Sequence, residues 1–408
     1  MAATLATIDA LLKDYYLEYI RNVMNSEVKL LKLFARTTEG WSGRQIIFPV
    51  RNSRNSGYGF RQDNSILPVA GQQGYVKSLI TAKIFYGRLQ LTGPSMVESR
   101  DSEGAFARAL STEIEYGMED FKDYFNVILF GDGSGKLATI EAGITLSTVG
   151  NNTITVDSTR YFQTNQVIGF VQAGVQVASA TVLTVNSTTS VTTGPATAAS
   201  VLVIGNTIAN NGDTGATIQG LLGIIDDGTD VGTLQGINRA TNPQWRASVL
   251  SNGGVLRPLT LDLLQRGVDI AYEKGGGKID RMIAHMGVRR EYIDILTPDV
   301  RFSPLDLKGG VERELMFNGQ IPFDFDRQCQ YNRVYMMDTP TIRLFVQDDF
   351  HWLDEDGSIL RSSAVGANGQ DLWEAAMRWM GELGTDAPVR NTRIDDIFQT
   401  VENVVLNN

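Results

Sequence analysis

The sequence predicts an α+β protein that carries an inserted all-β segment. Three observations predict this class. Apolar residues recur at helical spacing in the first third of the chain, strand-like and helix-like runs are mixed after residue 213, and the block 142–212 has the β-branched, turn-broken composition of strands. At roughly 150 residues per domain, a chain of 408 residues is long enough for about two or three packed units.

The first 40 residues predict an N-terminal arm. A stripe of apolar side chains recurs at three- and four-residue steps along one face of an amphipathic helix: Leu5, Ile8, Leu12, Tyr15, Tyr19 and Val23. A second short helix is expected after Ser26, ended by Gly40 and Gly43. Two placements remain open, because the helices can pack on their own domain or on a neighbouring subunit.

Residues 41–95 predict the two sides of a β-hairpin. QIIFPV (45–50) and the alternating stretch YVKSLITAKIFYGRLQL (75–91) are strand-like. The connection between them, residues 51–74, is rich in Asn, Ser, Gly and Gln and contains three arginines but no lysine. Connections of this length inside a compact domain are usually functional or disordered, so this one is expected to project.

The longest helical signal runs from about residue 102 to residue 130. Its apolar residues recur mainly at four-residue spacing: Phe106, Leu110, Ile114, Met118, Phe121, Phe125 and Leu129. Asp101 or Ser102 can cap the start, and Gly131 can end it. Such a helix is about 40 Å long and would cross a whole domain.

The block from Ala142 to Gly212 contains only two charged residues, Asp157 and Arg160, and is dominated by Thr, Val, Ser, Asn and Ala. Short alternating runs broken by Gly, Asn and Ser are typical of an antiparallel barrel or sandwich. We therefore expect a separate, inserted β-domain. The alternative is a disordered Thr/Ser-rich linker, which the density of Val and Ile disfavours.

After this block the pattern is mixed. PLTLDLLQRGVDIAYEKGGG (258–277) predicts a helix ended by three glycines, and RMIAHMGV (281–288) predicts a buried strand. RVYMMD (333–338) and TIRLFVQDDFHWL (341–353) predict further strands. DLWEAAMRWMGELG (371–384) predicts a C-terminal helix, with Leu372, Ala376, Trp379 and Leu383 on one stripe.

Composition argues against several classes of function. The chain has 36 Lys and Arg against 46 Asp and Glu, a net charge of −10, which disfavours a protein that holds nucleic acid by neutralising phosphates. One cysteine, Cys329, and two histidines, His285 and His351, argue against disulfide frameworks and His- or Cys-based metal centres. No stretch reaches the roughly 18 apolar residues of a membrane span, and the N-terminus lacks signal-peptide features. We expect a soluble, cytoplasmic protein.

Two kinds of motif suggest chemistry, but neither provides good evidence for a catalytic or binding site. GDGSGK (131–136) has Phe130 where a phosphate loop needs its first glycine and Leu137 where it needs Ser or Thr, so a helix-ending turn is expected. The pairs Asp226–Asp227 and Asp348–Asp349 could serve as acid and base, but paired carboxylates are common on acidic surfaces, and both pairs are expected there. The sequence predicts no enzyme, cofactor or metal.

Basic residues concentrate in and around the projecting loop: Arg51, Arg54, Arg61, Lys77 and Arg88. Two interpretations compete, a contact with nucleic acid and a cationic segment that lies across an acidic neighbouring subunit. The net negative charge of the chain favours the second interpretation, because a homo-oligomer of acidic subunits supplies its own partner.

The joint order of these elements resembles the major capsid protein family of tailed phages, which adopts the Hong Kong 97 shell fold. Four stretches sharpen the resemblance: KIFYGRLQLTGP (83–94), GAFARALSTEIEYGMEDFKDYFNVILFGDGSGKLA (104–138), LQGINRATNPQW (234–245) and DDFHWLDEDGSILR (348–361). None is a catalytic signature. Apart from the β-rich block, the resemblance covers most of the chain.

The resemblance implies a division of the chain. It has an N-terminal arm (1–40), an extended loop with its strands (41–95), a spine helix with part of the peripheral domain (96–141), a β-rich insertion domain (142–212), a mainly axial domain (213–340), and peripheral-domain strands with a C-terminal helix or tail (341–408). It further implies pentamers and hexamers in an icosahedral shell that encloses double-stranded DNA, assembled in the host cytoplasm.

The same resemblance implies where subunits meet. The loop would lie over the next subunit, with Arg51, Arg54 and Arg61 against acidic groups, while Leu12 and Tyr19 of the arm bury apolar area. The best-known member cross-links a loop lysine to an asparagine of a neighbour, but this loop has no lysine. We therefore expect noncovalent stabilisation, together with separate scaffolding, portal and cement proteins.

Three alternatives remain open. An encapsulin-like bacterial compartment would share the fold and enclose enzymes rather than a genome. A tail or adhesin component would use the charge-poor β-domain for binding. A metal-independent glycan-active enzyme that uses paired Asp residues belongs to a different class.

Overall fold

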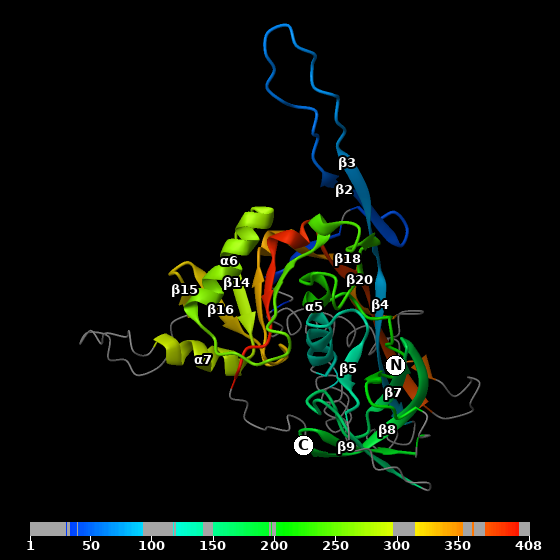
Figure 1. The fold of residues 1–408 in the computed structure, drawn as a ribbon. Helices are drawn as coiled ribbons and strands as arrows, with labels where there is room; N and C mark the ends of the chain where they lie inside the picture. Colours follow the sequence, from blue (N-terminus) through cyan, green and yellow to red (C-terminus); the bar gives the residue numbers. More distant parts are fainter. Residues whose placement is uncertain are drawn as a thin grey trace, which may run out of the picture.

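The computed structural model describes residues 30, 33–38, 40–92, 117, 120–141, 150–195, 197, 201–296, 315–353, 361–362 and 372–399. These residues form a body built on three sheets, from which one long hairpin projects (Figure 1). The hairpin leaves one end of the body, and a sheet made by the β-rich block lies at the opposite end. Within the described ranges, no helix is both long and apolar enough to cross a membrane.

The projecting hairpin consists of β2 (Gln45–Ser53) and β3 (Gly74–Thr81), which pair antiparallel. The predicted hairpin is confirmed, but the expected single strand over 75–91 is wrong. At Ala82 the chain turns from β3 into β4 (Lys83–Thr92), which pairs with a strand of the body instead. The Ala82 amide donates to the carbonyl of Arg44 (3.0 Å), which closes the base of the hairpin where the two sheets separate.

A five-stranded sheet forms the centre of the body. Its order is β1–β18–β20–β19, and β4 also pairs with β20. The additional strands are β1 (Ala35–Thr37), β18 (Ile342–Trp352), β19 (Arg361–Ser362) and β20 (Leu372–Thr385). Residues 120–129 are helical and pack on this sheet, where the Phe125 ring lies 5.1 Å from Trp379 and 5.6 Å from Phe350.

Two of the predicted helices, the long one over 102–130 and the short one after Ser26, are confirmed only in part. The long helix is confirmed over 120–129, and residue 117 is also helical, whereas the predicted start at 102–116 lies outside the described residues. Residues 30 and 33 are helical, but the chain then becomes β1, so the second short helix does not extend to Gly40. Leu30 and Phe34 are buried in the main apolar core, which fixes this segment to its own chain.

The predicted C-terminal helix is wrong, because residues 372–385 form the long strand β20. Ala375, Met377 and Trp379 are buried, and the residues between them are partly exposed, which is the alternation of a strand. Pairing with β4 and β18 on its two sides satisfies the backbone, and this tertiary context overrides the helix propensity of Ala, Met, Leu and Glu. A Cβ at Gly381 would stand 2.6 Å from the carbonyl oxygen of Phe345, so neighbouring strands approach closely there.

The β-rich block forms a six-stranded antiparallel sheet in the order β5–β10–β7–β8–β9–β6. Its strands are β5 (Lys136–Thr139), β6 (Asn152–Thr155), β7 (Val167–Gln172), β8 (Val175–Ser187), β9 (Ser190–Gly194) and β10 (Thr207–Asn210). It has its own apolar core, which includes Ile154, Phe162 and Phe170. The predicted all-β character is confirmed, and the linker alternative is wrong for the described part of the block.

The third sheet has the order β13–β21–β17–β14–β16–β15 and a second core. Its strands are β13 (Ser248–Leu250), β14 (Arg281–Ala284), β15 (Met316–Phe317), β16 (Ile321–Phe325), β17 (Val334–Met337) and β21 (Thr392–Ile394). The predicted helix is confirmed as α6 (Leu261–Gly275), capped by Thr260 and ended by left-handed Gly276. The strand predicted over 281–288 ends at Ala284, and α7 (Met286–Leu296) follows.

Short elements connect the sheets. They are α5 (Leu221–Ile224), the two-stranded pair β11 (Thr233–Leu234) and β12 (Ile237–Asn238), and the 3-10 turns η2 (Pro243–Trp245), η4 (Thr339–Thr341) and η5 (Pro388–Arg390). As predicted, GDGSGK is a turn that follows the helix and leads into β5. Asp132 accepts a hydrogen bond from the Ser134 amide (2.9 Å), and Gly133 and Gly135 have positive φ.

Candidate functional site

The loop at the end of the projecting hairpin, residues 54–73, has a defined shape without regular secondary structure. Its two legs touch, since a Cβ at Gly57 would stand 2.5 Å from the amide nitrogen of Gly71. Asn55 accepts a hydrogen bond from the Gly57 amide (2.7 Å), and Ser53 accepts one from the Gly74 amide (2.7 Å). Glycines at the contact therefore let the loop narrow at its base and carry a folded tip.

The structure places the three predicted loop arginines, all exposed, along the hairpin. Arg61 donates from Nε to the carbonyl of Ile66 (3.0 Å) and from Nη1 to that of Phe60 (3.2 Å), so it helps to shape the tip. Arg51 donates to the carbonyl of Ser53 (3.3 Å). Within the described part of the chain, Arg51, Arg54 and Arg61 form no ion pair.

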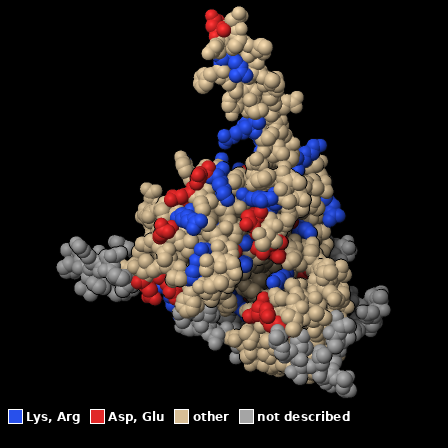
Figure 2. Space-filling view, in the orientation of Figure 1, with Lys and Arg blue, Asp and Glu red and all other residues tan. Residues whose placement is uncertain are grey.

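Sequence reasoning missed the apolar character of the tip. Five large apolar side chains there are between 78% (Tyr58) and 104% (Phe60) exposed: Tyr58, Phe60, Ile66, Leu67 and Val69. The signal was present in YGF and ILPV within the polar segment. Figure 2 shows the hairpin standing clear of the body, with basic groups along it and an acidic group at its end. An exposed apolar cluster of this size usually marks an interaction surface.

The other predicted contact residues are not brought into this surface. Leu12 and Tyr19 lie outside the described residues. Arg88 lies on β4 and pairs with Glu374 of the neighbouring strand β20, with Nε 2.8 Å from the carboxylate. Lys77 is exposed on β3, in the stem of the hairpin.

The prediction that both pairs of aspartates lie on the surface is wrong for Asp226. Asp226 is fully buried, not on the surface, and its carboxylate lies 3.3 Å from Arg239 and 3.6 Å from Arg393. Arg239 also donates to four backbone carbonyls, and burial lowers its pKa to about 10. Arg393 reaches Asp230 (2.8 Å) and Asp395 (3.0 Å). The second pair, Asp348–Asp349, is half-buried to exposed, as expected.

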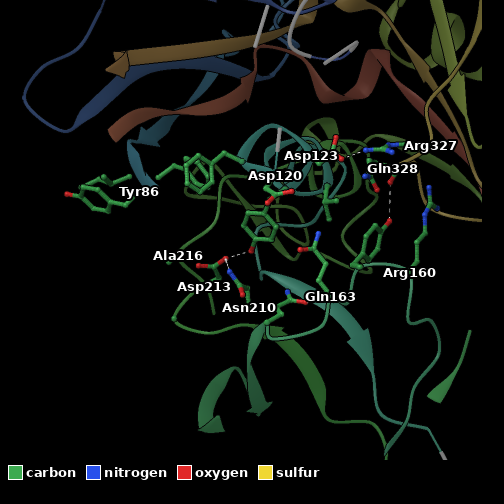
Figure 3. Close-up of a pocket in the computed structure, with 18 residues that line it drawn as sticks. Tyr86, Asp120, Asp123, Arg160, Gln163, Asn210, Asp213, Ala216, Arg327 and Gln328 are labelled. Carbon is green, nitrogen blue, oxygen red and sulfur yellow. Dashed lines mark hydrogen bonds and ion pairs between the residues drawn. The ribbon is translucent and has the colours of Figure 1, made fainter. Parts of the chain in front are cut away.

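A cavity of about 470 Å³ lies between β4, the helix 120–129, the β-rich sheet and residues 327–328 (Figure 3). Its polar groups bond one another, because Tyr124 donates to Asp213 and Arg327 pairs with Asp123. Burial raises the pKa of the Asp213 carboxyl. The residues that line it include no Ser, Cys or His, so it offers no activated nucleophile of those kinds.

A further buried carboxyl lies at the end of β20. Glu382 accepts hydrogen bonds from the amides of Gln219 (2.6 Å) and Leu383 (3.1 Å), yet burial raises its pKa to about 8. No group of three or more His, Cys, Asp or Glu side chains that could hold a metal occurs in the described ranges. Among the described residues, the most distinctive surface is the projecting hairpin.

Comparison with known proteins gives a structural match without a sequence match. No family model matches the chain, and no curated protein matches its sequence. One chain of the cyanophage A-1(L) capsid asymmetric unit aligns with a TM-score of 0.60 and 15% identity, covering 91% of this chain and 93% of that chain. The fold is that of a capsid protein.

Two further structures give weaker alignments. A chain of the capsid of Myoviridae phage XM1 aligns at a TM-score of 0.48 and 8% identity, covering 91% of this chain and 92% of that chain. A chain of the capsid of a native GTA particle aligns at 0.44 and 9% identity, covering 91% of each chain. The fold assignment rests on the cyanophage match, which gives this chain the fold of a chain in a phage capsid.

Proposed function

We propose that the chain is the major capsid protein of a tailed double-stranded DNA phage and forms an icosahedral shell of the Hong Kong 97 type. The observation that carries the proposal is the hairpin β2–β3, which projects an exposed apolar tip from a body with the capsid-protein fold. A protein that stays alone in water gains nothing from such a tip. A second copy of the chain offers a surface on which the apolar tip can be buried.

Contact energies favour a closed shell. Burying one large apolar side chain stabilises a contact by about 1.5–3 kcal/mol, so the tip alone supplies several such increments to each contact. Every subunit in a closed shell gives one hairpin and receives another. Multivalency then makes closure strongly favourable although each single contact is weak.

The arginines add charge to this contact. Arg51 and Arg54 keep their guanidinium groups exposed, and we propose that they face acidic side chains of the next subunit. Arg61 combines two roles, because its bonds to Phe60 and Ile66 hold the tip while it remains exposed. The contribution of Leu12 and Tyr19, in the arm, remains part of the proposal.

The domain layout is proposed on the same basis. Residues 41–95 would be the extended loop and its strands, 142–212 the insertion domain, and 213–340 mainly the axial domain. The net charge of −10 suits a container for DNA that is enclosed rather than bound in sequence. Scaffolding, portal and cement proteins would be separate chains.

Deleting residues 52–72 tests the proposal. In the parent Arg51 pairs with Tyr75, so the deletion leaves Gln73–Gly74 as a two-residue turn between paired strand positions. We expect folded protein that forms no shells by negative-stain microscopy and size-exclusion chromatography. The double variant Val255→Ser, Leu256→Ser, which removes exposed apolar groups from the body, is the control and should assemble. Intact shells from the deletion would sink the proposal.

The alternatives predict different particles. An encapsulin-like compartment would co-purify with protein cargo rather than nucleic acid. A tail or adhesin protein would form rings or tubes, and an enzyme would turn over substrate as a soluble species. The structural match to a phage capsid chain, which covers most of both chains, supports the capsid proposal and none of these three alternatives.

A further inference from the structure

The short turn between β11 and β12 reaches out of the third sheet's connecting loops and touches the base of the projecting hairpin. The carbonyl of Gln235 accepts a hydrogen bond from the Leu79 amide of β3 (2.8 Å). A Cβ on Gly236 would lie 3.4 Å from the Leu79 Cβ, so the contact is close. Further up the stem, Asn242 accepts a hydrogen bond from Asn52 of β2 (3.1 Å).

The Gln235 side chain joins three elements. In the orientation that satisfies both ends of its amide, the nitrogen lies 3.0 Å from Ser78 Oγ and 3.0 Å from the Thr385 carbonyl, and the oxygen accepts from the Thr385 amide (2.7 Å). β4 pairs with β20 only as far as Gly381, so Gln235 contacts β20 beyond the end of that ladder. The amide thus bridges the hairpin stem and the central sheet.

The backbone at this turn is held in a conformation that its residue type does not favour. Gln235 has φ 51° and Gly236 has φ 75°, the left-handed pair of a two-residue hairpin turn. Glycine would fit the first position without strain, yet a glutamine stands there. A Cβ at Gly384 would come 2.7 Å from the end of the Gln235 amide that carries the oxygen in this orientation, so β20 leaves space for that side chain.

The loop that carries the turn is itself fixed. Arg239, one residue after β12, donates to the carbonyls of Gly223 (2.9 Å), Ile224 (2.8 Å) and Val231 (3.0 Å) and pairs with buried Asp226. Trp245 donates from its indole to the carbonyl of Leu234 (3.1 Å). The turn is therefore a rigid support rather than a mobile loop that happens to lie nearby.

We propose that Gln235 is a positioning residue that fixes the direction in which the hairpin β2–β3 leaves the body. Besides this amide, the stem is tied to the body by the chain at Ala82, the bond between Asn52 and Asn242, the backbone bond at Leu79, and the packing of Ile46 and Ile80 on Phe345. Its importance for assembly rests on the proposed function, because the tip must meet a neighbour at a defined place.

The test measures the direction of the stem. Spin labels attached at Tyr75→Cys on the stem and Tyr272→Cys on α6 report the distance between these two positions in one chain. The labelled protein is mixed with an excess of unlabelled protein, so that labels on different subunits do not contribute to the measured distances. Cys329 is fully buried and burial raises its thiol pKa, so it takes no label. Gln235→Gly keeps the left-handed turn and removes the amide. Gln244→Ala, an exposed residue of the same loop, is the control.

We expect the distance distribution to broaden or shift in Gln235→Gly and to match the parent in Gln244→Ala. The Leu79 amide should exchange roughly two- to tenfold faster in the first variant. A distribution as narrow as the parent's would overturn the proposal. Should Gln235→Gly lose its folded circular dichroism, Ser78→Ala, which removes the partner on β3, decides in the same way.

Shell yield separates this inference from the proposed function. A broadened distribution with fewer shells supports both. A broadened distribution with shells at the parent yield keeps the positioning role and contradicts the need for a defined hairpin direction in assembly. An unchanged distribution rejects the positioning role, while the deletion of 52–72 still tests the function.

Discussion

The body and the projecting hairpin handle charge and apolar surface in opposite ways. In the body, buried Asp226 and Arg239 are paired with each other and with backbone groups, and three large apolar cores are closed. On the hairpin, Phe60 and its apolar neighbours are exposed and the arginines have no acidic partner in the described chain. The difference teaches that the body encloses its main charge pairs and apolar side chains within one chain, whereas the hairpin leaves both exposed, which fits the proposed contact with another subunit.

The largest effect on this comparison should come from the buried network. Arg239→Leu leaves Asp226 buried without its closest cation and removes donors from four carbonyls. We expect the free energy of unfolding to fall by about 3–5 kcal/mol. Urea denaturation followed by circular dichroism measures it. A loss under about 1 kcal/mol would show that Arg393 alone neutralises the site.

A change at the tip should spare folding and weaken assembly. Phe60→Ser removes a fully exposed side chain, so the free energy of unfolding should stay at the parent value. Each subunit contact should weaken by about 1.5–3 kcal/mol, which raises the concentration of free subunit at assembly equilibrium. Size-exclusion chromatography measures that concentration. Val255→Ser is the matched control, and an equal effect in both variants would contradict a special role of the tip.

A smaller effect is expected for the pH dependence of the body. The pKa of Glu382 is raised from 4.5 to about 8 in the folded protein, so folding favours the protonated carboxyl. This stability is complete below pH 4.5 and is lost as the pH rises toward 8, by up to about 1.4 kcal/mol per pH unit. Glu382→Gln should remove this slope. Comparing parent and variant by urea denaturation cancels the other carboxyls, and a pH-independent difference would refute the assignment.

The smallest effect is expected where a charge pair lies at the surface. Arg343 and Asp386 are 3.2 Å apart, and both side chains are nearly half exposed. Arg343→Leu should change the free energy of unfolding by about 0–1 kcal/mol. The same denaturation experiment tests it beside Arg239→Leu. Equal losses in the two variants would remove the distinction between buried and exposed charge pairs.

Local pattern predicted much of the fold but not its long-range partners. The β-rich block, α6 and the projecting hairpin follow from composition and periodicity. The segment 371–384 misled because its helical stripe and its strand alternation share Trp379, and only pairing with β4 and β18 decides between them. Asp226 looked like a surface residue because its two partners, Arg239 and Arg393, come to it only in the folded chain, Arg393 from near the end of the sequence.

The candidate site was half predicted. The length and composition of 51–74 indicated a projecting loop, and the structure shows one whose three arginines are exposed. The apolar tip is visible in the sequence as YGF and ILPV, but these short runs lie within a polar segment in which the arginines are the stronger signal. The Gln235 contact could not be predicted, because it depends on a left-handed turn meeting a strand more than 150 residues earlier in the chain.

The positions of β20 and β21 have a consequence for synthesis. β20 lies between β4 and its other partners in the central sheet, and β21 lies between β13 and β17 in the third sheet. Both sheets thus receive an inner strand from residues 372–394. A growing polypeptide cannot close either sheet until the ribosome has passed this segment. A product that stops before this segment therefore exposes bare strand edges in both sheets, which are ready to pair with other chains.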